Sequence, residues 1–208
     1  MAVTTYAELQ TALDNWLART DLQSRHPEFI ALAEARMNRE LETRSQAKRV
    51  TTTTTADDAY VTLPADARRV RYVRLNTSPI TVLRFLSPNA ADNEIRSTGT
   101  GKPIYYSVQG NELYLRPSPD DTYTIEIDYY ATIEALSDSN TSNTILARHP
   151  DAYLHGSLSE AYGFLLDEQR QTYHDQLFTR AMTDITEDEQ RVKYGGSPLT
   201  VQSPYGEK

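Results

Sequence analysis

The stretch Arg148-His149-Pro150-Asp151-Ala152-Tyr153-Leu154-His155-Gly156 decides the fold of this chain. Pro150 suits the first position of a helix, and Asp151 faces the positive end of the helix dipole. Behind this start, apolar side chains recur three or four residues apart, at Leu154, Leu158, Ala161 and Leu165. This spacing predicts an amphipathic helix with one apolar face.

A second amphipathic helix is predicted to follow a break or cap at Asp167. Its apolar face consists of Tyr173, Leu177, Ala181, Met182 and Ile185. Two helices of this length form a hairpin, and a hairpin alone leaves each apolar face half covered. Other helices must therefore pack against it.

The N-terminal residues predict that second pair of helices. Thr5 and Glu8 stand three residues apart, which is the capping box that starts a helix. The apolar face of the first helix is Tyr6, Leu9, Leu13, Trp16 and Leu17, and that of the second is Ile30, Ala33, Met37 and Leu41. The second helix opens with Arg25-His26-Pro27-Glu28, which is nearly the same sequence as residues 148–151. Because the motif recurs at two predicted helix starts, we interpret His26 and His149 as helix caps rather than metal ligands.

The middle of the chain changes from helical to β patterns. Thr51 to Thr55 are five consecutive β-branched residues, which favour a strand. The pair Gly110-Asn111 is a two-residue turn that closes a hairpin, and the alternation from Thr122 to Tyr129 predicts a half-buried strand. Together they predict an antiparallel meander. We also expect a short strand over Pro79–Phe85 and a bulge between Tyr72 and Val73.

The predicted fold class is α+β. Its N- and C-terminal helix pairs form one bundle, with an inserted antiparallel β domain and an extended C-terminal arm. The predicted parts are residues 1–44 and 147–192 for the bundle, 45–146 for the β domain and 193–208 for the arm. The core of the bundle is predicted to contain Leu13, Trp16, Ile30, Met37, Leu154, Leu158, Leu177 and Met182.

The arm after Tyr194 cannot continue the helix, because its glycines free the backbone and its prolines forbid helical hydrogen bonding. Its apolar residues have no remaining element of the chain to cover them. We therefore predict that the arm binds a partner, and the alternative is a frayed terminus. The residues predicted to form this contact are Gly195, Gly196, Pro198, Leu199, Val201, Pro204 and Tyr205.

The composition favours subunit contacts and excludes several classes of protein. The 208 residues include 14 tyrosines but only 38% apolar residues, which suits extended interfaces. The absence of cysteine excludes disulfides and thiolate metal sites. No apolar run is long enough to span a membrane, and Met1–Thr5 lacks the features of a signal peptide. We therefore expect the protein to be made and used in the cytoplasm of the cell that produces it.

The net charge of −8 is unevenly distributed. Residues 120–190 contain fifteen acids against three arginines, a net charge of −12, whereas residues 36–74 carry a net charge of +4. Opposite signs at opposite ends suit head-to-tail stacking between unlike rings, and a solvated face is the alternative. A net acidic chain is a poor binder of duplex DNA.

No arrangement of residues predicts catalysis, a metal site or a cofactor. His149 and His155 stand six residues apart, not the four that a helical metal pair needs. The segment Thr98-Gly99-Thr100-Gly101-Lys102 lacks the context of a phosphate loop. Asp120, Asp121 and Asp128 have the chemistry to hold a cation, but the first two lie in a proline turn, where acids are common. We expect no enzymatic activity.

Short motifs at both ends of the chain carry a resemblance. They are His149–Gly156, Glu160-Ala161-Tyr162, Asp167-Glu168 and Tyr194-Gly195-Gly196, with Tyr6-Ala7-Glu8-Leu9, Trp16-Leu17-Ala18-Arg19 and Phe29-Ile30-Ala31-Leu32-Ala33-Glu34. Their order and spacing are similar to those of head-to-tail adaptor proteins of tailed bacteriophages, and the resemblance covers about half of the chain.

The resemblance implies a structural protein of the virion neck, between head and tail. Members of that family form a dodecameric ring on the portal protein, to which the C-terminal arm reaches, and complete the DNA-filled head. A tail, nozzle or second adaptor protein would attach below. DNA would pass through the channel of the ring without specific binding.

An alternative function is a carbohydrate-binding β domain on a helical stalk. Its stacking platform would use Tyr105, Tyr106, Tyr129 and Tyr130. Adjacent residues of a strand point to opposite faces of the sheet, so at most one tyrosine of each pair can join a platform. That geometry weakens the alternative.

Overall fold

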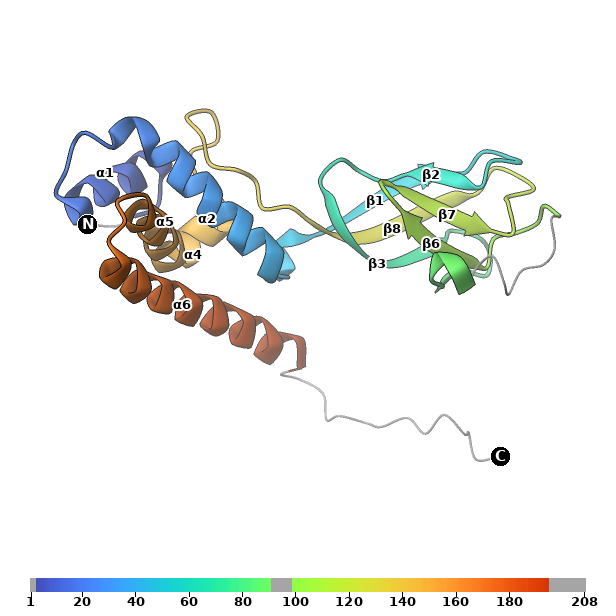
Figure 1. Ribbon diagram of the computed structural model, residues 1–208. Coiled ribbons are helices and arrows are strands. Elements are labelled where there is room, and N and C mark those ends of the chain that lie inside the picture. The colour runs from blue at the N-terminus through green and yellow to red at the C-terminus, as the bar shows by residue number, and fades with distance from the viewer. Residues whose placement is uncertain (1–2, 91–98, 195–208) are drawn as a thin grey trace. The chain divides into compact units, whose positions relative to one another are not determined.

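A computed structural model describes residues 3–90 and 99–194, with side chains described as far as Val192 (Figure 1). The chain divides into two compact units. The helical unit consists of Met1–Arg44 and Ile133–Lys208, and the β unit consists of Ser45–Thr132. The predicted α+β class is confirmed.

The helical unit is built around one central helix. Its helices are α1 (Tyr6–Leu17), α2 (His26–Glu40), α4 (Thr144–Arg148), α5 (Pro150–Phe164) and α6 (Glu168–Tyr194), with short 3-10 turns at Gln23–Arg25 and Arg44–Gln46. Helix α5 packs against α1, α2, α4 and α6 (Figure 1). The stretch that opens the sequence analysis is therefore the centre of the unit.

Local sequence signals explain most of the helix starts. Thr5 Oγ1 accepts a hydrogen bond from Glu8 N, and Glu8 Oε2 accepts one from Thr5 N, so the predicted capping box is confirmed. Asp167 Oδ1 accepts a hydrogen bond from Arg170 N at the start of α6. The interpretation of the two histidines as caps holds only for His149, which is the N-cap residue of α5, although its side chain makes no capping hydrogen bond. It is wrong for His26, because the N-cap residue of α2 is Arg25.

His26 is instead a buried residue of the helical core. Its side chain is 1% exposed, and its Nε2 lies 3.6 Å from Oδ1 of Asp14 in α1. Burial lowers the pKa of the imidazole, which outweighs the attraction of Asp14 for the charged form. The histidine before Pro27 therefore packs α2 against α1.

The core of the helical unit differs from the prediction at two positions. Of the predicted residues, Leu13, Ile30, Met37, Leu158 and Met182 are buried, and Leu154 is partly buried. Trp16 is 51% exposed. Leu177 is only partly buried, because the face of α6 that packs against α5 runs through His174, Phe178, Ala181, Met182 and Ile185. The apolar face predicted for α6 was therefore shifted by one residue at two places. His174 is buried in place of Tyr173, which is exposed, and Phe178 is buried in place of Leu177.

Helices α5 and α6 approach closely at a glycine. A Cβ atom added to Gly156 would lie 2.9 Å from the ring of Phe178 and 3.1 Å from Cβ of Ala33. A larger residue would require the Phe178 ring or Ala33 to move. Gly156 therefore allows α2, α5 and α6 to meet at one point.

A histidine pair lies on the same side of α5. His155 Nδ1 and His174 Nδ1 are 3.2 Å apart, so one imidazole donates a hydrogen bond to the other. The ring of Tyr162 stacks on His174 with 5.3 Å between centroids. Burial, and then the neighbouring His155 and Arg170, lower the pKa of His174 to about 4.

The segment between the β unit and α4 belongs to the helical unit. The sequence analysis placed this boundary at residue 146, whereas the structure divides the chain after Thr132. Asn38 Oδ1 accepts a hydrogen bond from Ile133 N, and Glu34 Oε1 accepts one from Leu136 N. The buried Tyr153 hydroxyl also donates to Glu34 Oε1, at 3.1 Å. These polar groups of α2 bind a loop that sequence patterns alone cannot assign.

The β unit is a sandwich of two four-stranded sheets. One sheet has the order β1 (Ala47–Thr53), β8 (Thr124–Ala131), β3 (Ala67–Leu75) and β4 (Thr81–Val82), and the other has β2 (Tyr60–Thr62), β7 (Glu112–Arg116), β6 (Tyr105–Gln109) and β5 (Arg84–Phe85). Their facing sides enclose Val61, Leu63, Val73, Leu75, Leu83, Tyr106, Leu113, Leu115, Ile125, Ile127, Tyr129 and Ala131.

The predicted hairpin is confirmed, and the predicted meander is wrong. Gly110, with a φ of 61°, and Asn111 join β6 to β7. Strand β8 does not continue that sheet but pairs with β1 and β3 in the other one. Both β7 and β8 have apolar residues to bury, and strands in opposite sheets can cover each other's apolar faces.

Three details of the β prediction also need correction. The strand expected over Pro79–Phe85 is two short strands, β4 and β5, that lie in different sheets. The pairing of β5 with β6 is parallel, so the β unit is not wholly antiparallel. The register of β3 shifts between Ala67 and Arg69 and again between Val70 and Tyr72, rather than after Tyr72.

The outer face of β8 carries two buried carboxylates. Glu126 binds Arg49 of β1 at 3.0 Å and Arg74 of β3 at 2.8 Å. Asp128 binds Arg71 at 2.9 Å, and Arg49 Nη2 lies 3.6 Å from it. The hydrogen bond from Arg74 lowers the pKa of Glu126. These ion pairs connect all three strands across one face of the sheet.

Truncating Leu158 should destabilise the helical unit. Its side chain is fully buried, so Leu158→Ala should lower the free energy of unfolding by about 2–5 kcal/mol. Urea denaturation followed by helical circular dichroism measures this change. Leu166→Ala is the control, because Leu166 is 88% exposed and its truncation should cost less than about 0.5 kcal/mol. Equal midpoints for the two variants would contradict this packing.

Acid should destabilise the helical unit through His174. Its pKa is 6.5 in the unfolded reference and about 4 in the folded protein. The unfolded chain therefore binds the proton first as the pH falls. Stability from this group is complete above pH 6.5 and is lost as the pH falls toward 4, by roughly 2 kcal/mol at pH 4.5.

The variant His174→Phe keeps an aromatic ring beside Tyr162 and cannot be protonated. Between pH 7 and 4.5 it should lose less stability than the wild-type protein, as measured by urea denaturation at each pH. If both proteins lose stability in parallel, the burial of His174 does not control the acid response.

Candidate functional site

The residues predicted to form the binding arm lie outside the described residues. They are Gly195, Gly196, Pro198, Leu199, Val201, Pro204 and Tyr205. The structure does describe helix α6, which ends at Tyr194, immediately before them. The geometry of α6 therefore determines where the arm begins.

The first half of α6 is fixed by packing and by an arginine of α2. Arg36 forms ion pairs with Glu160 of α5, at 3.2 Å, and with Asp175 of α6. Its guanidinium also lies 4.5 Å from the centroid of the Phe178 ring, a cation–π distance. Arg36 thus joins three helices at the point where Gly156 lets them meet.

The second half of α6 is exposed on nearly all sides. From Thr186 to Val192 no described side chain is buried. Among the described side chains, Glu189 connects this part of the helix to the segment after α2: its Oε2 accepts hydrogen bonds from Arg44 N, at 2.9 Å, and from Arg44 Nε, at 3.2 Å. The turns of α6 that precede the arm are therefore anchored through Glu189, and their other described side chains are exposed.

Sequence reasoning missed these anchoring residues. Arg36 and Asp175 are 139 residues apart in the chain, and Arg44 and Glu189 are 145 apart. No local periodicity marks such pairs, because a charged side chain on a helix surface is ordinary in sequence. Only the tertiary fold identifies them.

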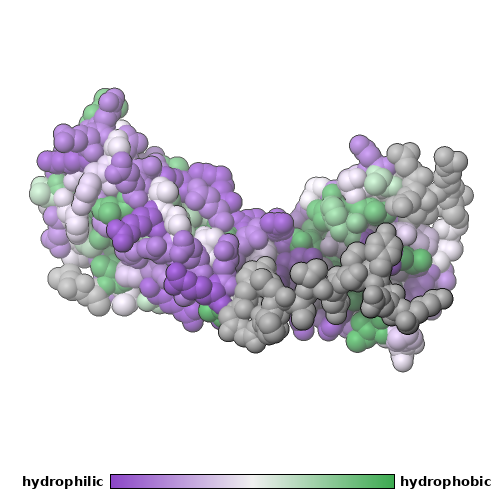
Figure 2. All heavy atoms as spheres, turned by 90° about the horizontal axis from the view of Figure 1, so that it is seen from below, coloured by the Kyte–Doolittle hydropathy of each residue, from purple (hydrophilic) through white to green (hydrophobic). Residues whose placement is uncertain are grey.

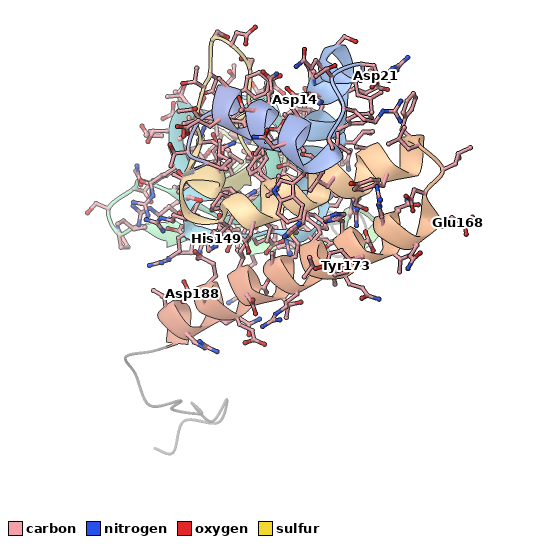
Figure 3. The ribbon with its side chains drawn as sticks, turned by 90° about the vertical axis from the view of Figure 1, so that its left-hand side faces the viewer. Asp14, Asp21, His149, Glu168, Tyr173 and Asp188 are labelled. Atoms are coloured by element: carbon pink, nitrogen blue, oxygen red, sulfur yellow. The ribbon has the colours of Figure 1, made fainter. Side chains whose placement is uncertain are left out.

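The acidic charge of the chain belongs to the helical unit. Counted over the two units, the helical unit has a net charge of −8 and the β unit has equal numbers of acidic and basic residues. Hydrophilic side chains predominate over the helical unit on the face seen in Figure 2. Along α6, Glu168 and Asp188 stand near opposite ends (Figure 3), and Asp184 and Glu187 lie between them.

Exposed aromatic side chains lie beside the histidine pair. Trp16 and Tyr173 are both about half exposed. The Trp16 ring lies edge-on to His155 and His174, with 5.8 Å between ring centroids, and the Tyr173 ring lies edge-on to His174 at 5.2 Å. At the turn between α5 and α6, Phe164 is 50% exposed and Leu166 is 88% exposed. Clustered aromatic residues at a surface are typical of contacts between proteins.

The four tyrosines considered for a sugar platform do not form one. Tyr106 and Tyr129 are buried in the sandwich core. Tyr105 and Tyr130 are partly exposed, but Tyr105 lies on β6 and Tyr130 on β8, in different sheets. The four side chains therefore cannot present one stacking surface.

The carboxylates considered for a cation are not brought together. Asp128 binds arginines, whereas Asp120 Oδ1 accepts a hydrogen bond from the Tyr123 hydroxyl at 2.7 Å. Among the residues that the structure describes, no three histidine, aspartate or glutamate side chains are placed to hold a metal ion. Within the same residues, no helix combines the length and the apolar character needed to cross a membrane.

Comparison with known proteins identifies the family. No curated protein matches this sequence. A family model described as SU10 adaptor protein matches residues 4–202. The matched range includes both helix pairs, the β unit and the start of the arm. The motifs that resembled phage adaptors include Tyr153 and Gly156, which the structure places at the centre of the helical unit. The chain therefore belongs to the SU10 adaptor protein family of phage head-to-tail adaptors.

Proposed function

We propose that this protein forms a ring on the portal protein, completes the DNA-filled head and provides the attachment platform for the tail. The observation that carries the proposal is the family match over nearly the whole chain. A head-to-tail adaptor is a structural component, and this role requires no catalytic group. The finer assignments below concern the ring, the arm and the channel.

The ring is proposed to contain twelve subunits, as the resemblance to phage adaptors implies. The exposed rings of Trp16 and Tyr173, which both contact His174, supply an apolar surface for contact between neighbouring subunits. Burial of such a surface would stabilise the ring without any change in the fold of the subunit. This surface accounts for the exposure of Trp16, which the sequence had placed in the core.

The arm is proposed to bind the portal. Helix α6 carries the chain away from its buried segment, and its last described turns are exposed. An extended segment can dock in a groove with alternate side chains, such as Leu199 and Val201, as anchors. In a ring, many weak arm contacts act together through a high effective concentration.

The helical unit is proposed to line part of the DNA channel. Its net charge of −8 repels phosphates, and this repulsion would prevent DNA from adhering as it passes. The neck of the virion, between head and tail, is the location that this role requires. A tail, nozzle or second adaptor protein is the proposed partner on the tail side.

Removing the arm should abolish binding to the portal protein without destabilising the fold. A stop after Lys193 removes no buried residue that the structure describes, so the melting temperature should be nearly unchanged. Binding to the portal protein of the same phage should be abolished, and heads assembled with the truncated protein should leak DNA. Pull-down with purified portal rings and a nuclease-protection assay measure the two effects.

Point variants within the arm provide a matched comparison. Leu199→Ala with Val201→Ala should weaken portal binding, whereas Ser197→Ala with Gln202→Ala should not. If the truncated protein still assembles on portals with normal affinity, the arm has no binding role.

The purified protein should not bind duplex DNA near physiological ionic strength. Fluorescence anisotropy with a labelled 30-base-pair duplex measures this at several salt concentrations. Tight binding that weakens steeply with salt would show that basic residues, not the acidic helical unit, face the DNA.

A further inference from the structure

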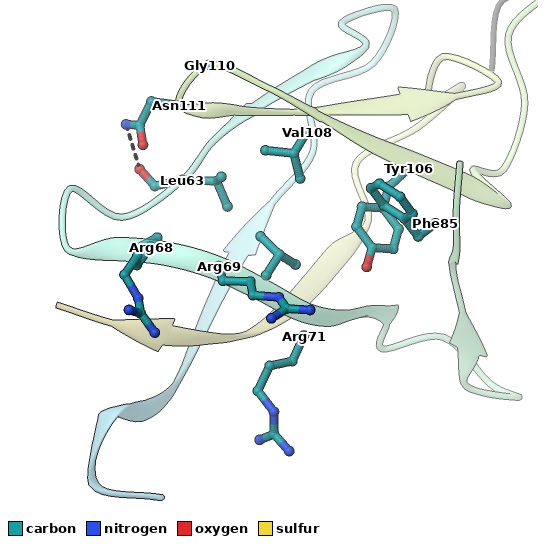
Figure 4. A pocket seen from close by; sticks show the side chains of 11 residues that line it. Leu63, Arg68, Arg69, Arg71, Phe85, Tyr106, Val108, Gly110 and Asn111 are labelled. Atoms are coloured by element: carbon teal, nitrogen blue, oxygen red, sulfur yellow. Dashed lines mark hydrogen bonds between the residues drawn. The ribbon is translucent and has the colours of Figure 1, made fainter. Parts of the chain in front are cut away.

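Leu166 lies in the turn between α5 and α6 and is 88% exposed, more than any other large apolar side chain that the structure describes. Phe85 of the β unit is also exposed, but it has neighbours in its own unit. It lines a cavity of about 490 Å³, and its ring centroid lies 5.5 Å from that of Tyr106 (Figure 4). Single exposed leucines are common on protein surfaces. The exposure of Leu166 is unusual because of the backbone conformation that accompanies it.

Leu166 adopts a backbone conformation that suits glycine. Its φ is 58°, in the left-handed region, where the Cβ atom of an L-residue is crowded. Two other described non-glycine residues have a positive φ, Ala18 and Asp57. Alanine has a small side chain, and aspartate tolerates this region comparatively well. Leu166 is therefore the bulky residue among the three.

The turn at Leu166 is a Schellman motif, which ends many helices. Tyr162 O accepts a hydrogen bond from Asp167 N at 3.0 Å, and Gly163 O accepts one from Leu166 N at 3.1 Å. The position that Leu166 occupies in this motif usually holds glycine. Glycine would form the same two hydrogen bonds with less strain and without an apolar side chain in water. The turn itself does not require the leucine, and an outlier of this kind points to a use outside the subunit.

A series of contacts connects this turn to the surface proposed for subunit contact. Asp167 forms an ion pair with Arg170 at 3.5 Å, and the Arg170 guanidinium lies 5.5 Å from the centroid of the Tyr162 ring. Tyr162 stacks on His174, which contacts both of the exposed rings proposed to meet a neighbouring subunit. Leu166 therefore adjoins residues that are part of the same packed cluster.

A second apolar side chain lies beside Leu166 in the sequence. Phe164 is 50% exposed, and the guanidinium of Arg25 lies 4.8 Å from its ring centroid. Arg25 is paired with Glu28 at 3.1 Å, so it keeps a counter-charge if the turn becomes buried. Apolar side chains bordered by paired charges are typical of the centre and rim of a protein interface.

We propose that Leu166 anchors the contact between neighbouring subunits, with its side chain in an apolar hollow of the next copy of this chain. The inference rests on the ring proposed above and names a residue that holds it together. The contacts through Arg170, Tyr162 and His174 favour a second copy over the portal or a tail protein, because they lead to the surface that faces the neighbouring subunit in that ring. The strain at Leu166 is then offset by apolar burial in the assembly.

Leu166→Gly should stabilise the isolated subunit while it weakens the ring. Glycine suits a φ of 58°, so the equilibrium constant for folding should rise by about two- to fivefold. Urea denaturation of the full-length protein measures this change. A variant that is more stable yet assembles less well cannot owe its defect to misfolding.

Assembly is measured by mass photometry of purified portal rings titrated with the full-length protein. The wild-type protein should fill the portal cooperatively, because each bound subunit offers a contact to the next. Leu166→Gly should raise the concentration needed for complete filling at least about tenfold, which is the loss expected when one leucine is removed from a buried contact. The first subunit should bind with unchanged affinity, because its arm is intact.

Two control variants accompany this titration. Leu166→Met keeps an apolar side chain at the turn and should fill portals within about twofold of the wild-type concentration. Leu32→Ala removes a half-exposed leucine from α2, and it should also leave the filling unchanged.

The possible failures are distinguishable. If the wild-type protein forms rings and Leu166→Gly fills portals equally well, this inference is overturned and the proposed ring stands. Weaker binding of the first subunit with unchanged cooperativity would place Leu166 against the portal, which also overturns the inference. A wild-type protein that forms no ring would contradict the proposed function, and this inference with it.

Discussion

The close approach of α5 to α2 and α6 at Gly156 is the constraint on which the helical unit depends. A single Cβ at this position would overlap the ring of Phe178 and press on Ala33. The contact lets Arg36 reach both Glu160 and Asp175, and it brings His174 against His155. With the first half of α6 fixed in this way, the second half can be exposed without losing its position. The short motif by which the chain resembles phage adaptors is therefore structural.

The two units of the chain differ in net charge and in the way each is stabilised. The helical unit carries the whole net charge of −8, and its helices surround a core supplied by both ends of the chain. The β unit is electrically balanced, and its buried carboxylates Glu126 and Asp128 are held by arginines from both neighbouring strands. The inserted β unit has a hydrophobic core of its own. This division suits the proposed ring, in which the helical unit would tolerate passing DNA and the β unit would offer surfaces to partner proteins.

The sequence predicted those features that short segments determine by themselves. The capping box of Thr5 and Glu8, the Gly110-Asn111 turn and the helix start at Pro150 all follow from local chemistry. The features that the sequence analysis predicted wrongly depend on tertiary contacts. Leu177 and Phe178 are adjacent apolar residues, and only the position of α5 decides which one is buried. Strand β8 has the pattern of a meander strand, but it is the partner sheet that determines its neighbours.

The central claim is that this chain forms a ring on the portal and that its arms make the contact. Electron cryo-microscopy of the full-length protein mixed with the portal protein tests it most directly. The account predicts a twelve-fold ring on the portal, with one extended segment from each subunit, beginning after Tyr194, seated against a portal subunit. A ring attached through the β unit, with no portal contact from residues 195–205, would contradict it.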